Sequence, residues 1–292
     1  MAFLTASALF GIAFVFFDFR ISYQAGFDAE GRIAGVAFVQ YARCGWAQDL
    51  SLPVADRAML HADNAYHLPH CRIESHRLKT NTQSATAFRG FGGPQGMLGI
   101  ERVLDHIAHY LKQDALDIRR RNFYADMAVT PHSSARSENA QTTPYGMPVT
   151  DFILHQLTDQ LAKTSQYLDR KAAIKTWNMQ NPILKRGIAL TPVKFGISFT
   201  LSHLNQAGAL VHLYQDGSIR INHGGTEMGQ GLFQKLAQVA AFEFGVDMQQ
   251  IKITATDTAK VPNTSATAAS SGSDLNGMES NGPANRSPRA SA

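Results

Sequence analysis

Three glycine-rich loops constrain the fold of this chain most, because each leads directly into a segment with the pattern of a packed element. They lie at residues 87–96 (AFRGFGGPQG), 223–231 (HGGTEMGQG) and 262–272 (PNTSATAASSG). Glycine lets a backbone approach a ligand closely, and the free N–H groups at a helix start attract anions. The loops lack the Lys-Ser/Thr of a P-loop and the dinucleotide-binding fingerprint after a strand. On pattern alone they are either ordinary tight turns or a cradle for a large polar cofactor that carries phosphate.

Hydrophobic periodicity predicts an α+β fold. Residues 20–41 alternate as a β-hairpin with turn residues at 28–31, and a second hairpin surrounds Asp216-Gly217. Strands and helices mix without a regular βαβ rhythm, and we find no internal repeat. The other predicted elements are helices at 56–64, 94–112, 114–121, 151–162, from 167 to before Pro182, and 232–244, with strands at 186–194 and 251–256.

The two ends of the chain differ from its middle. Residues 2–17 are apolar and uncharged, yet shorter than the ~20 residues of a spanning helix, and no basic residue precedes them as in a signal peptide. Residues 279–292 hold no apolar side chain larger than Ala or Pro, which is typical of a disordered tail. We therefore expect a leader at 1–18, two folded parts at 19–180 and 181–278, and a tail at 279–292.

Charge and cysteine usage exclude several classes of protein. The chain has 27 Lys and Arg against 23 Asp and Glu, a formal charge of +4, without a dense basic stripe. A nucleic-acid partner is therefore not expected. Cys44 and Cys71 are the only cysteines, which excludes a disulfide scaffold, a four-cysteine zinc site and an all-cysteine iron–sulfur cluster. Their scarcity fits a reducing compartment.

Some side chains could carry chemistry without a cofactor. Histidines near Cys71 could bind zinc, but their spacing matches no standard structural site, so buried or surface histidines are the preferred interpretation. A Cys–His nucleophilic pair has no identifiable activating partner. Glu227 is either a general base or a residue that stabilises a helix start. The histidines concerned are His61, His67, His70 and His76.

The loops and two further motifs, taken together and in order, resemble the molybdenum-binding subunit of the xanthine dehydrogenase/aldehyde oxidase family. The first matching stretch consists of KTN at 79–81 and the AFRGFGGPQG loop. The others are KFGISFT at 194–200 with LNQAGA at 204–209, the HGGTEMGQG loop, and VPNTSATAASS at 261–271. The resemblance covers about residues 19–278 and implies the α+β molybdopterin-binding domains of that family.

The resemblance implies a molybdenum hydroxylase, an oxidoreductase of purine catabolism in the cytoplasm that converts hypoxanthine and xanthine towards uric acid. The metal is held by the dithiolene of molybdopterin, so no protein side chain is required as a metal ligand. Electrons leave through 2Fe–2S clusters to FAD. Since two cysteines cannot hold those clusters, they are expected on a partner chain or domain, the iron–sulfur/FAD subunit. No membrane partner is expected.

The resemblance also assigns cofactor contacts residue by residue. Arg89 matches the arginine whose backbone contacts the cofactor at the metal, and Ala269 also lies near molybdenum in that assignment. The expected cofactor-binding residues are Phe88, Arg89, Gly90, Gly229, Gln230, Thr267, Ala268, Ala269 and Ser270.

Substrate contacts follow from the same resemblance. Phe91 and Phe199 match two aromatics that sandwich a flat ring, one stacked on its face and one edge-on, and Thr200 matches a substrate-contacting position. Arg57 matches an arginine that pairs with a substrate oxygen and stabilises developing negative charge, as a fixed, permanently charged donor fork can. Related aldehyde oxidases generally lack this arginine, so Arg57 favours a purine.

The sequence departs from the family pattern at both ends. The family's substrate-binding glutamate and metal-facing glutamine precede the recognisable region, and its general-base glutamate follows it. We therefore expect an internal fragment that is inactive alone, and we do not assign Glu227 as a substitute base. Alternatives are a non-catalytic module that binds pterin or purine or another subunit, an aldehyde oxidase-like enzyme, and a membrane-anchored derivative that uses residues 2–17.

Overall fold

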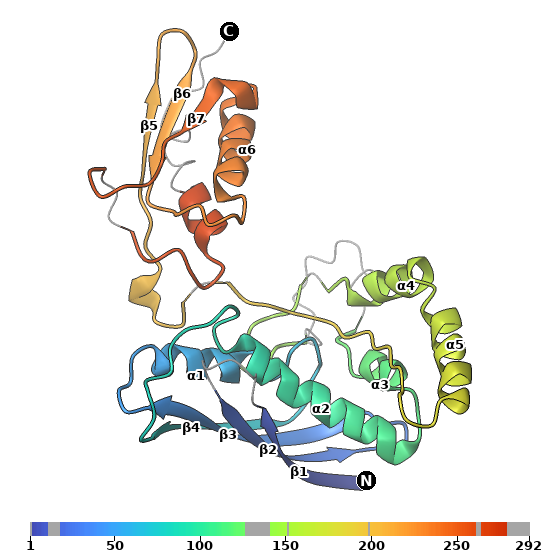
Figure 1. Cartoon of the computed structure of the whole chain (residues 1–292). Coiled ribbons are helices and arrows are strands. Elements are labelled where there is room, and N and C mark those ends of the chain that lie inside the picture. The colour runs from blue at the N-terminus through green and yellow to red at the C-terminus, as the bar shows by residue number, and fades with distance from the viewer. Residues whose placement is uncertain are drawn as a thin grey trace. The chain divides into compact units, whose positions relative to one another are not determined.

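The computed structural model describes residues 2–10, 18–125, 141–150, 152–197, 199–260 and 264–278, with backbone alone for 3–10. The chain divides into two compact units, unit 1 at Met1–Phe195 and unit 2 at Gly196–Ala292, and each is described by itself (Figure 1). The predicted tail at 279–292 and the stretch 126–140 lie outside the described residues.

Unit 1 contains a four-stranded sheet in the order β1-β2-β3-β4. Strands β1 (Ala2–Phe10), β2 (Phe19–Phe27) and β3 (Ile33–Gly45) are antiparallel neighbours, and β4 (Cys71–Lys79) runs parallel to β3. The β2–β3 hairpin is the one predicted. Its turn is fixed by the Asp28 carboxylate, which accepts hydrogen bonds from the backbone N–H groups of Glu30 and Arg32.

The helices of unit 1 lie on one side of this sheet and beyond its edge (Figure 1). Helix α2 buries Ile100, Val103, Leu104 and Ile107 on the face that its 3.6-residue period predicts. Helix α3 begins after Asp114, whose side chain accepts a hydrogen bond from Leu116 N at 2.9 Å, as expected for a cap. The helices are α1 (Ser51–Leu60), α2 (Gly93–Leu111), α3 (Ala115–Arg121), α4 (Leu154–Thr164) and α5 (Tyr167–Gln180).

Helices α1 and α2 approach so closely that two positions of the crossing admit only glycine. A Cβ on Gly92 would lie 2.0 Å from the carbonyl oxygen of Val54, and one on Gly96 would lie 2.1 Å from that of Ala58. Both carbonyls belong to the backbone of α1 and cannot move aside as a side chain can. The glycines of the first loop therefore set the spacing between the two helices.

Unit 2 repeats the arrangement of β2, β3, α1 and β4. Strands β5 (Ala209–Leu213) and β6 (Ile219–His223) form the predicted hairpin, helix α6 (Leu232–Phe244) follows, and β7 (Ile251–Ile253) lies parallel to β6. Ile219, Ile221 and Ala240 form the core between sheet and helix. Helix α6 ends at Gly245, whose φ of 66° suits a glycine C-cap. Two 3₁₀ turns, Ser202–Leu204 and Met248–Gln250, and a helical segment at residues 272–278 also belong to this unit.

Four sequence predictions need correction. Helix α1 begins at Ser51 rather than 56, because Pro53 is tolerated in a first turn. Strand β4 was missed because its charged, half-exposed residues obscure the alternation, as is common at a sheet edge. Strand β7 is shorter than 251–256. Finally, β3-α1-β4 and β6-α6-β7 are parallel crossovers that the pattern did not indicate.

The predicted strand at 186–194 does not form, because side chains bind its backbone in place of a neighbouring strand. Asn178 pairs with both the N–H and the carbonyl of Arg186, at 2.8 and 2.9 Å. Asn64 does the same for Lys194 N and Pro192 O, at 3.0 Å each. This extended segment therefore stays on unit 1, and the compact units divide after Phe195, later than the boundary expected after residue 180.

The apolar leader contributes to the sheet where it is described. Its residues 2–10 form β1, paired with β2 from Ala2↔Phe27 to Phe10↔Phe19, and residues 11–17 lie outside the described part. Among the described residues, no helix has both the length and the apolar character needed to cross a membrane.

We expect Gly96→Ala to destabilise unit 1 by about 1–3 kcal/mol, because the new methyl group meets a backbone oxygen. Gly99→Ala is the matched control on the same helix. Its Cβ would meet only side-chain atoms, of Ile21 at 3.3 Å and of Phe38 at 3.8 Å, and alanine's helix propensity should add up to about 1 kcal/mol. Both tryptophans, Trp46 and Trp177, belong to unit 1, so urea unfolding followed by their fluorescence reports on this unit. Equal midpoints for the two variants would contradict the close helix crossing.

Candidate functional site

Arg57 is a charged side chain inside unit 1. It lies on α1 with 2% of its surface exposed, and burial lowers the pKa of its guanidinium. The guanidinium carbon lies 4.8 Å from the centroid of the Phe195 ring, a cation–π distance. Arg57 precedes Ala58, whose carbonyl oxygen lies against Gly96 of α2 at the crossing of the two helices. The fold thus brings the predicted arginine and the helix that follows the first loop together.

His61 lies one turn after Arg57 on the same side of α1. Its Nδ1 is 2.8 Å from the carbonyl oxygen of Arg57, and its ring centroid is 4.8 Å from that of Phe195. Burial lowers the pKa of His61 to about 4, so the ring is neutral near pH 7. Since a carbonyl only accepts, Nδ1 carries the proton and donates it to this hydrogen bond.

The first loop is an unusually left-handed stretch of backbone. Gly90, Phe91 and Gly92 have φ of 91°, 52° and 87°. Hydrogen bonds from Phe91 N to Phe88 O and from Gly93 N to Gly90 O close two consecutive turns, at 2.8 and 3.0 Å. A positive φ is uncommon for a phenylalanine and requires support from its surroundings. Phe91 is 5% exposed, so its packing supplies that support.

The predicted cofactor-binding residues of this loop are at least partly exposed to solvent. Phe88 is 52% exposed, Arg89 is exposed, and Gly90 is half-buried. Gly90 also packs against its own helix start, since a Cβ there would meet Pro94 at 2.4 Å. The loop therefore buries the predicted substrate residue, Phe91, and presents the predicted cofactor contacts.

The second loop is organised by Glu227. Its carboxylate accepts hydrogen bonds from the backbone N–H groups of Gly229, Gly231 and Phe233, at 2.9, 3.0 and 3.0 Å. These hydrogen bonds hold the pKa of Glu227 below its usual range, and the bond from Phe233 has the largest effect. A carboxylate of low pKa is a weak base. Glu227 therefore caps the start of α6, which agrees with the helix-start interpretation rather than a general base.

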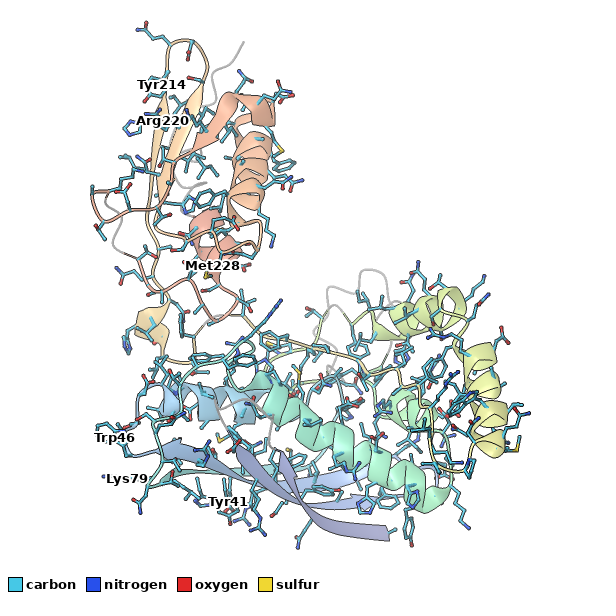
Figure 2. The ribbon with its side chains drawn as sticks, in the orientation of Figure 1. Tyr41, Trp46, Lys79, Tyr214, Arg220 and Met228 are labelled. Carbon is cyan, nitrogen blue, oxygen red and sulfur yellow. The ribbon has the colours of Figure 1, made fainter. Side chains whose placement is uncertain are left out.

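Gln230 and Gly229 form the outer side of the second loop. The Gln230 amide donates to Thr226 O at 2.8 Å and accepts from Met228 N at 2.5 Å, so it braces the turn. Met228 projects from this loop with 66% of its surface exposed (Figure 2). A Cβ on Gly229 or Gly231 would meet no atom of the described residues within 4 Å. A ligand can therefore approach the backbone at both glycines.

The third loop lies beside the second within unit 2. Thr226 N donates to Thr267 Oγ1 at 2.9 Å, and a Cβ on Gly224 would overlap the Thr264 side chain. Ala269 and Ser270 have φ of 55° and 59°, and Ser271 N closes the turn onto Ala268 O at 3.2 Å. Ala269 is buried, whereas Ser270 is exposed. Both predicted pterin loops are thus parts of one local structure.

Phe199 and Thr200 stand near the beginning of unit 2. Asn205 fixes the backbone of Phe199 from both sides: its Oδ1 accepts from Phe199 N at 2.8 Å and its Nδ2 donates to Phe199 O at 2.9 Å. Phe199 is 6% exposed and Thr200 is half-buried. Phe91 belongs to unit 1 and Phe199 to unit 2, so their predicted pairing around one ring stays a prediction.

These loops fit molybdopterin, a large polar group that requires no protein ligand for its metal. The open positions over Gly229 and Gly231 leave room for such a group, and the polar Thr267 and Ser270 suit contact with it through neutral side chains. Across the residues that the structure describes, no group of three or more His, Cys, Asp or Glu side chains could hold a metal ion. The zinc interpretation of the histidines therefore has no support there.

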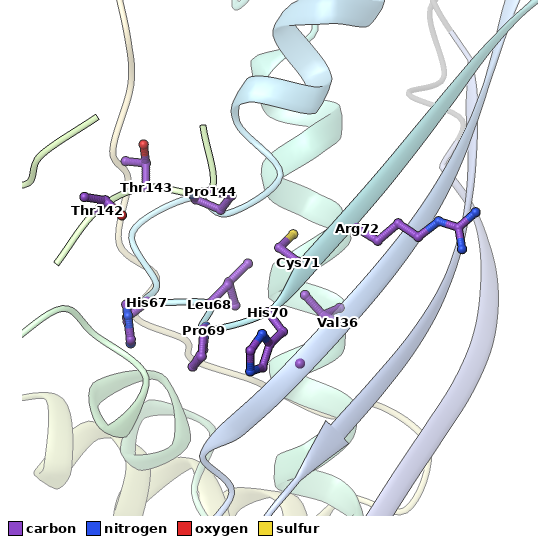
Figure 3. A pocket seen from close by; sticks show the side chains of 11 residues that line it. Val36, His67, Leu68, Pro69, His70, Cys71, Arg72, Thr142, Thr143 and Pro144 are labelled. Carbon is purple, nitrogen blue, oxygen red and sulfur yellow. The ribbon is translucent and has the colours of Figure 1, made fainter. Parts of the chain in front are cut away.

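A pocket of about 560 Å³ lies elsewhere in unit 1, between β3, the segment before β4 and residues 142–144 (Figure 3). His67, His70 and Cys71 line it, but none of the predicted site residues does. Burial, with a contribution from Asp63, raises the pKa of Cys71 to about 11, so its thiol is not an activated nucleophile. The geometry does not support a Cys–His site here.

Comparison with known proteins decides the family. Two families described as molybdopterin cofactor-binding domains match residues 15–123 and 160–279. The chain is 43% identical over 260 residues to xanthine dehydrogenase of Drosophila subobscura and 44% identical, over the same length, to that of Dictyostelium discoideum. This chain belongs to the xanthine dehydrogenase family. It is therefore a member of a molybdenum-dependent oxidoreductase family.

The matches to xanthine dehydrogenases cover most of this chain but a small part of those proteins. Each of these two matches covers 89% of this chain but 18% of the relative's length. Among solved structures, quinoline 2-oxidoreductase of Pseudomonas putida matches with a TM-score of 0.72 at 20% identity, over 92% of this chain and 34% of that one. Aldehyde oxidoreductase of Desulfovibrio desulfuricans gives 0.70 at 20% identity, over 89% and 28%. These likenesses confirm the predicted fold class.

Sequence reasoning missed two residues that contact Arg57 in the candidate site. Phe195 lies within the KFGISFT motif but has no role predicted from the resemblance, yet it covers Arg57. The sequence analysis interprets His61 as a buried or surface histidine rather than a zinc ligand, without placing it near Arg57, yet it binds the Arg57 carbonyl. The four-residue spacing of Arg57 and His61 on one helix could have indicated their proximity. No sequence signal places Phe195 there, because its position depends on a contact between distant segments.

We expect unit 1 to lose stability as the pH falls from about 6.5 towards 4. The pKa of His61 is lowered in the folded state, so the unfolded chain binds more protons in this window and the stabilisation present above pH 6.5 is lost. The loss should reach about 3 kcal/mol at most. His61→Asn keeps an N–H donor but removes the titration, and exposed His109→Asn is the control. Urea unfolding of wild type and both variants at pH 7.5 and 5 measures this loss of stability. The same pH dependence in His61→Asn as in wild type would show that His61 does not cause it.

Proposed function

We propose that this chain is the molybdopterin- and purine-binding part of an enzyme that hydroxylates hypoxanthine or xanthine towards uric acid. The observation that carries the proposal is the buried Arg57 on α1, the helix that packs against the end of the first loop and the start of α2. In a site of low dielectric, a fixed guanidinium interacts strongly with charge that develops on a substrate oxygen. The family assignment supports the same chemistry.

Each unit contributes to this function through its own residues. Loops 223–231 and 264–271 of unit 2 would hold the pterin, and the backbone of Arg89 would contact the cofactor in unit 1. Bound molybdopterin supplies the oxidative chemistry. Arg57 binds a purine oxygen and stabilises its negative charge, Phe91 and Phe199 contact the flat ring, and Thr200 contacts the substrate. Glu227 does not take part in proton transfer, because it caps α6.

The proposal includes partners for electron transfer. With two cysteines, this chain does not supply the ligands of 2Fe–2S clusters, so we assign the clusters and FAD to a partner chain or domain. We also propose a cytoplasmic location.

We expect Gly229→Leu to lower the pterin content of purified protein about tenfold, because the side chain fills the open position over the second loop. Gly245→Leu is the matched control. It also has a positive φ and no described atom within 4 Å of its Cβ position, but it lies at the far end of α6. Protein from a host that makes the cofactor is analysed for molybdenum and for oxidised pterin fluorescence. Equal loss in both variants, or none in either, would contradict cofactor binding by this loop.

We expect Arg57→Lys and Arg57→Met to weaken hypoxanthine binding by about 10- to 100-fold. Methionine removes the charge-assisted hydrogen bond, whereas lysine keeps the charge but loses the planar donor fork of the guanidinium. Calorimetry on pterin-loaded protein measures this, with exposed Arg72→Met as control and benzaldehyde as a ligand without the purine oxygen.

Two results would redirect this proposal. Wild-type hypoxanthine affinity in Arg57→Met would favour an aldehyde-type substrate. The 292 residues taken alone should bind hypoxanthine without forming xanthine or uric acid, since the resemblance places the general base outside them. Uric acid production by them would refute that expectation.

A further inference from the structure

Phe195, the last residue of unit 1, contacts three parts of the candidate site at once. Its ring lies 4.8 Å from the Arg57 guanidinium carbon and 4.8 Å from the His61 ring. It also lies against the start of α2, where a Cβ on Gly93 would approach Phe195 Cε2 to 2.6 Å. The ring is half-buried, so one side of it covers the arginine.

The contact has the form expected of a restraint on a charged side chain. Arginine has several rotatable bonds, and a guanidinium is attracted to the face of an aromatic ring. Arg57 is also on a helix whose next turn carries His61, which the same ring touches. A ring in this position limits the orientations of the guanidinium while leaving it charged.

The segment before Phe195 is held in place by polar contacts with the loop after α1. Asn64 Oδ1 accepts from Lys194 N at 3.0 Å, and Asn64 Nδ2 donates to Pro192 O at 3.0 Å. Lys194 Nζ lies 2.5 Å from Oδ2 of Asp63, a carboxylate that is 1% exposed. A half-buried ion pair and two backbone contacts therefore fix the chain immediately before the ring.

Gly93 makes room for the ring. In the helical backbone of α2, an alanine at this position would displace Phe195 rather than strain its own φ. Thus a change in α2 can move Phe195 without altering Phe195 itself, and this separates the effect of the ring's position from that of its chemistry.

We propose that Phe195 is a positioning residue: its ring face holds the guanidinium of Arg57 in the orientation that receives a substrate oxygen. This inference rests on the function proposed for Arg57. Phe195 acts on the arginine, whereas the role expected of Phe91 and Phe199 is contact with the substrate ring.

The test is the rate at which phenylglyoxal modifies Arg57 in the full 292-residue chain, measured by peptide mass spectrometry. Phe195→Leu keeps apolar cover without a ring face, Phe195→Tyr restores the face, and Gly93→Ala displaces the native ring. Gly99→Ala is the control on the same helix. Arg186, which is exposed and lies 4.1 Å from the Trp177 ring, is the internal control in every sample. Tryptophan fluorescence in urea verifies that each variant is folded.

We expect Arg57 to react about three- to tenfold faster in Phe195→Leu and Gly93→Ala. Phe195→Tyr and Gly99→Ala should stay within about twofold of wild type, as should Arg186 throughout. Wild-type reactivity of Arg57 in Phe195→Leu, or equal reactivity in the Leu and Tyr variants, would overturn the proposal. If one of Phe195→Leu and Gly93→Ala fails to fold, the other decides.

A second measurement separates this inference from the function on which it rests. In pterin-loaded wild-type protein, hypoxanthine should slow the modification of Arg57. If it does not, the purine role of Arg57 fails, although the ring can still be shown to hold the side chain. If hypoxanthine protects Arg57 equally well in wild type and in Phe195→Leu, the positioning role is wrong while the proposed function stands.

Discussion

The close crossing of α1 and α2 is the constraint on which unit 1 depends. With Gly92 and Gly96 against the carbonyls of Val54 and Ala58, the two helices have no space for an intervening side chain. One of these glycines belongs to the left-handed loop and the other to the helix, so the same packing fixes the loop and the position of Arg57. A residue with a Cβ at either position would separate two parts of the candidate site. The glycines of AFRGFGG therefore serve packing as much as ligand approach.

In unit 1, polar side chains bind backbone groups that a neighbouring strand would bind in a sheet. Residues 186–194 run extended without a neighbouring strand, and asparagine side chains bind their backbone at two places. Asn64 also donates to Glu101 of α2, and Glu101 pairs with the buried Arg119 of α3. The loop after α1, two helices and the extended segment are thus joined through one asparagine and one carboxylate. Loss of Asn64 would leave the buried carbonyl of Pro192 without this partner, which is more costly than loss of a surface contact.

Sequence patterns predicted the features that depend on residues close together in the chain. The hairpin turn with Asp28, the Asp114 cap, the buried face of α2 and the glycine end of α6 all follow from nearby residues. The patterns failed where distant segments decide. Strand β4 forms because β3 offers it a parallel neighbour, and Phe195 covers Arg57 because Asn64 holds its segment. The roles of the site residues came from motif resemblance, and the geometry adds burial, backbone conformation and partners to each.

Glu227 has a consequence for how a cofactor enters unit 2. Its carboxylate already accepts from two N–H groups of the loop before α6 and one in the first turn of α6, so the polypeptide supplies the anion that a helix start attracts. The loop thus has its shape before any ligand arrives, and little ordering entropy remains to oppose binding. Cofactor insertion becomes docking into a preorganised surface rather than folding coupled to binding. A free phosphate or sulfate ion, for the same reason, finds this end of α6 already filled.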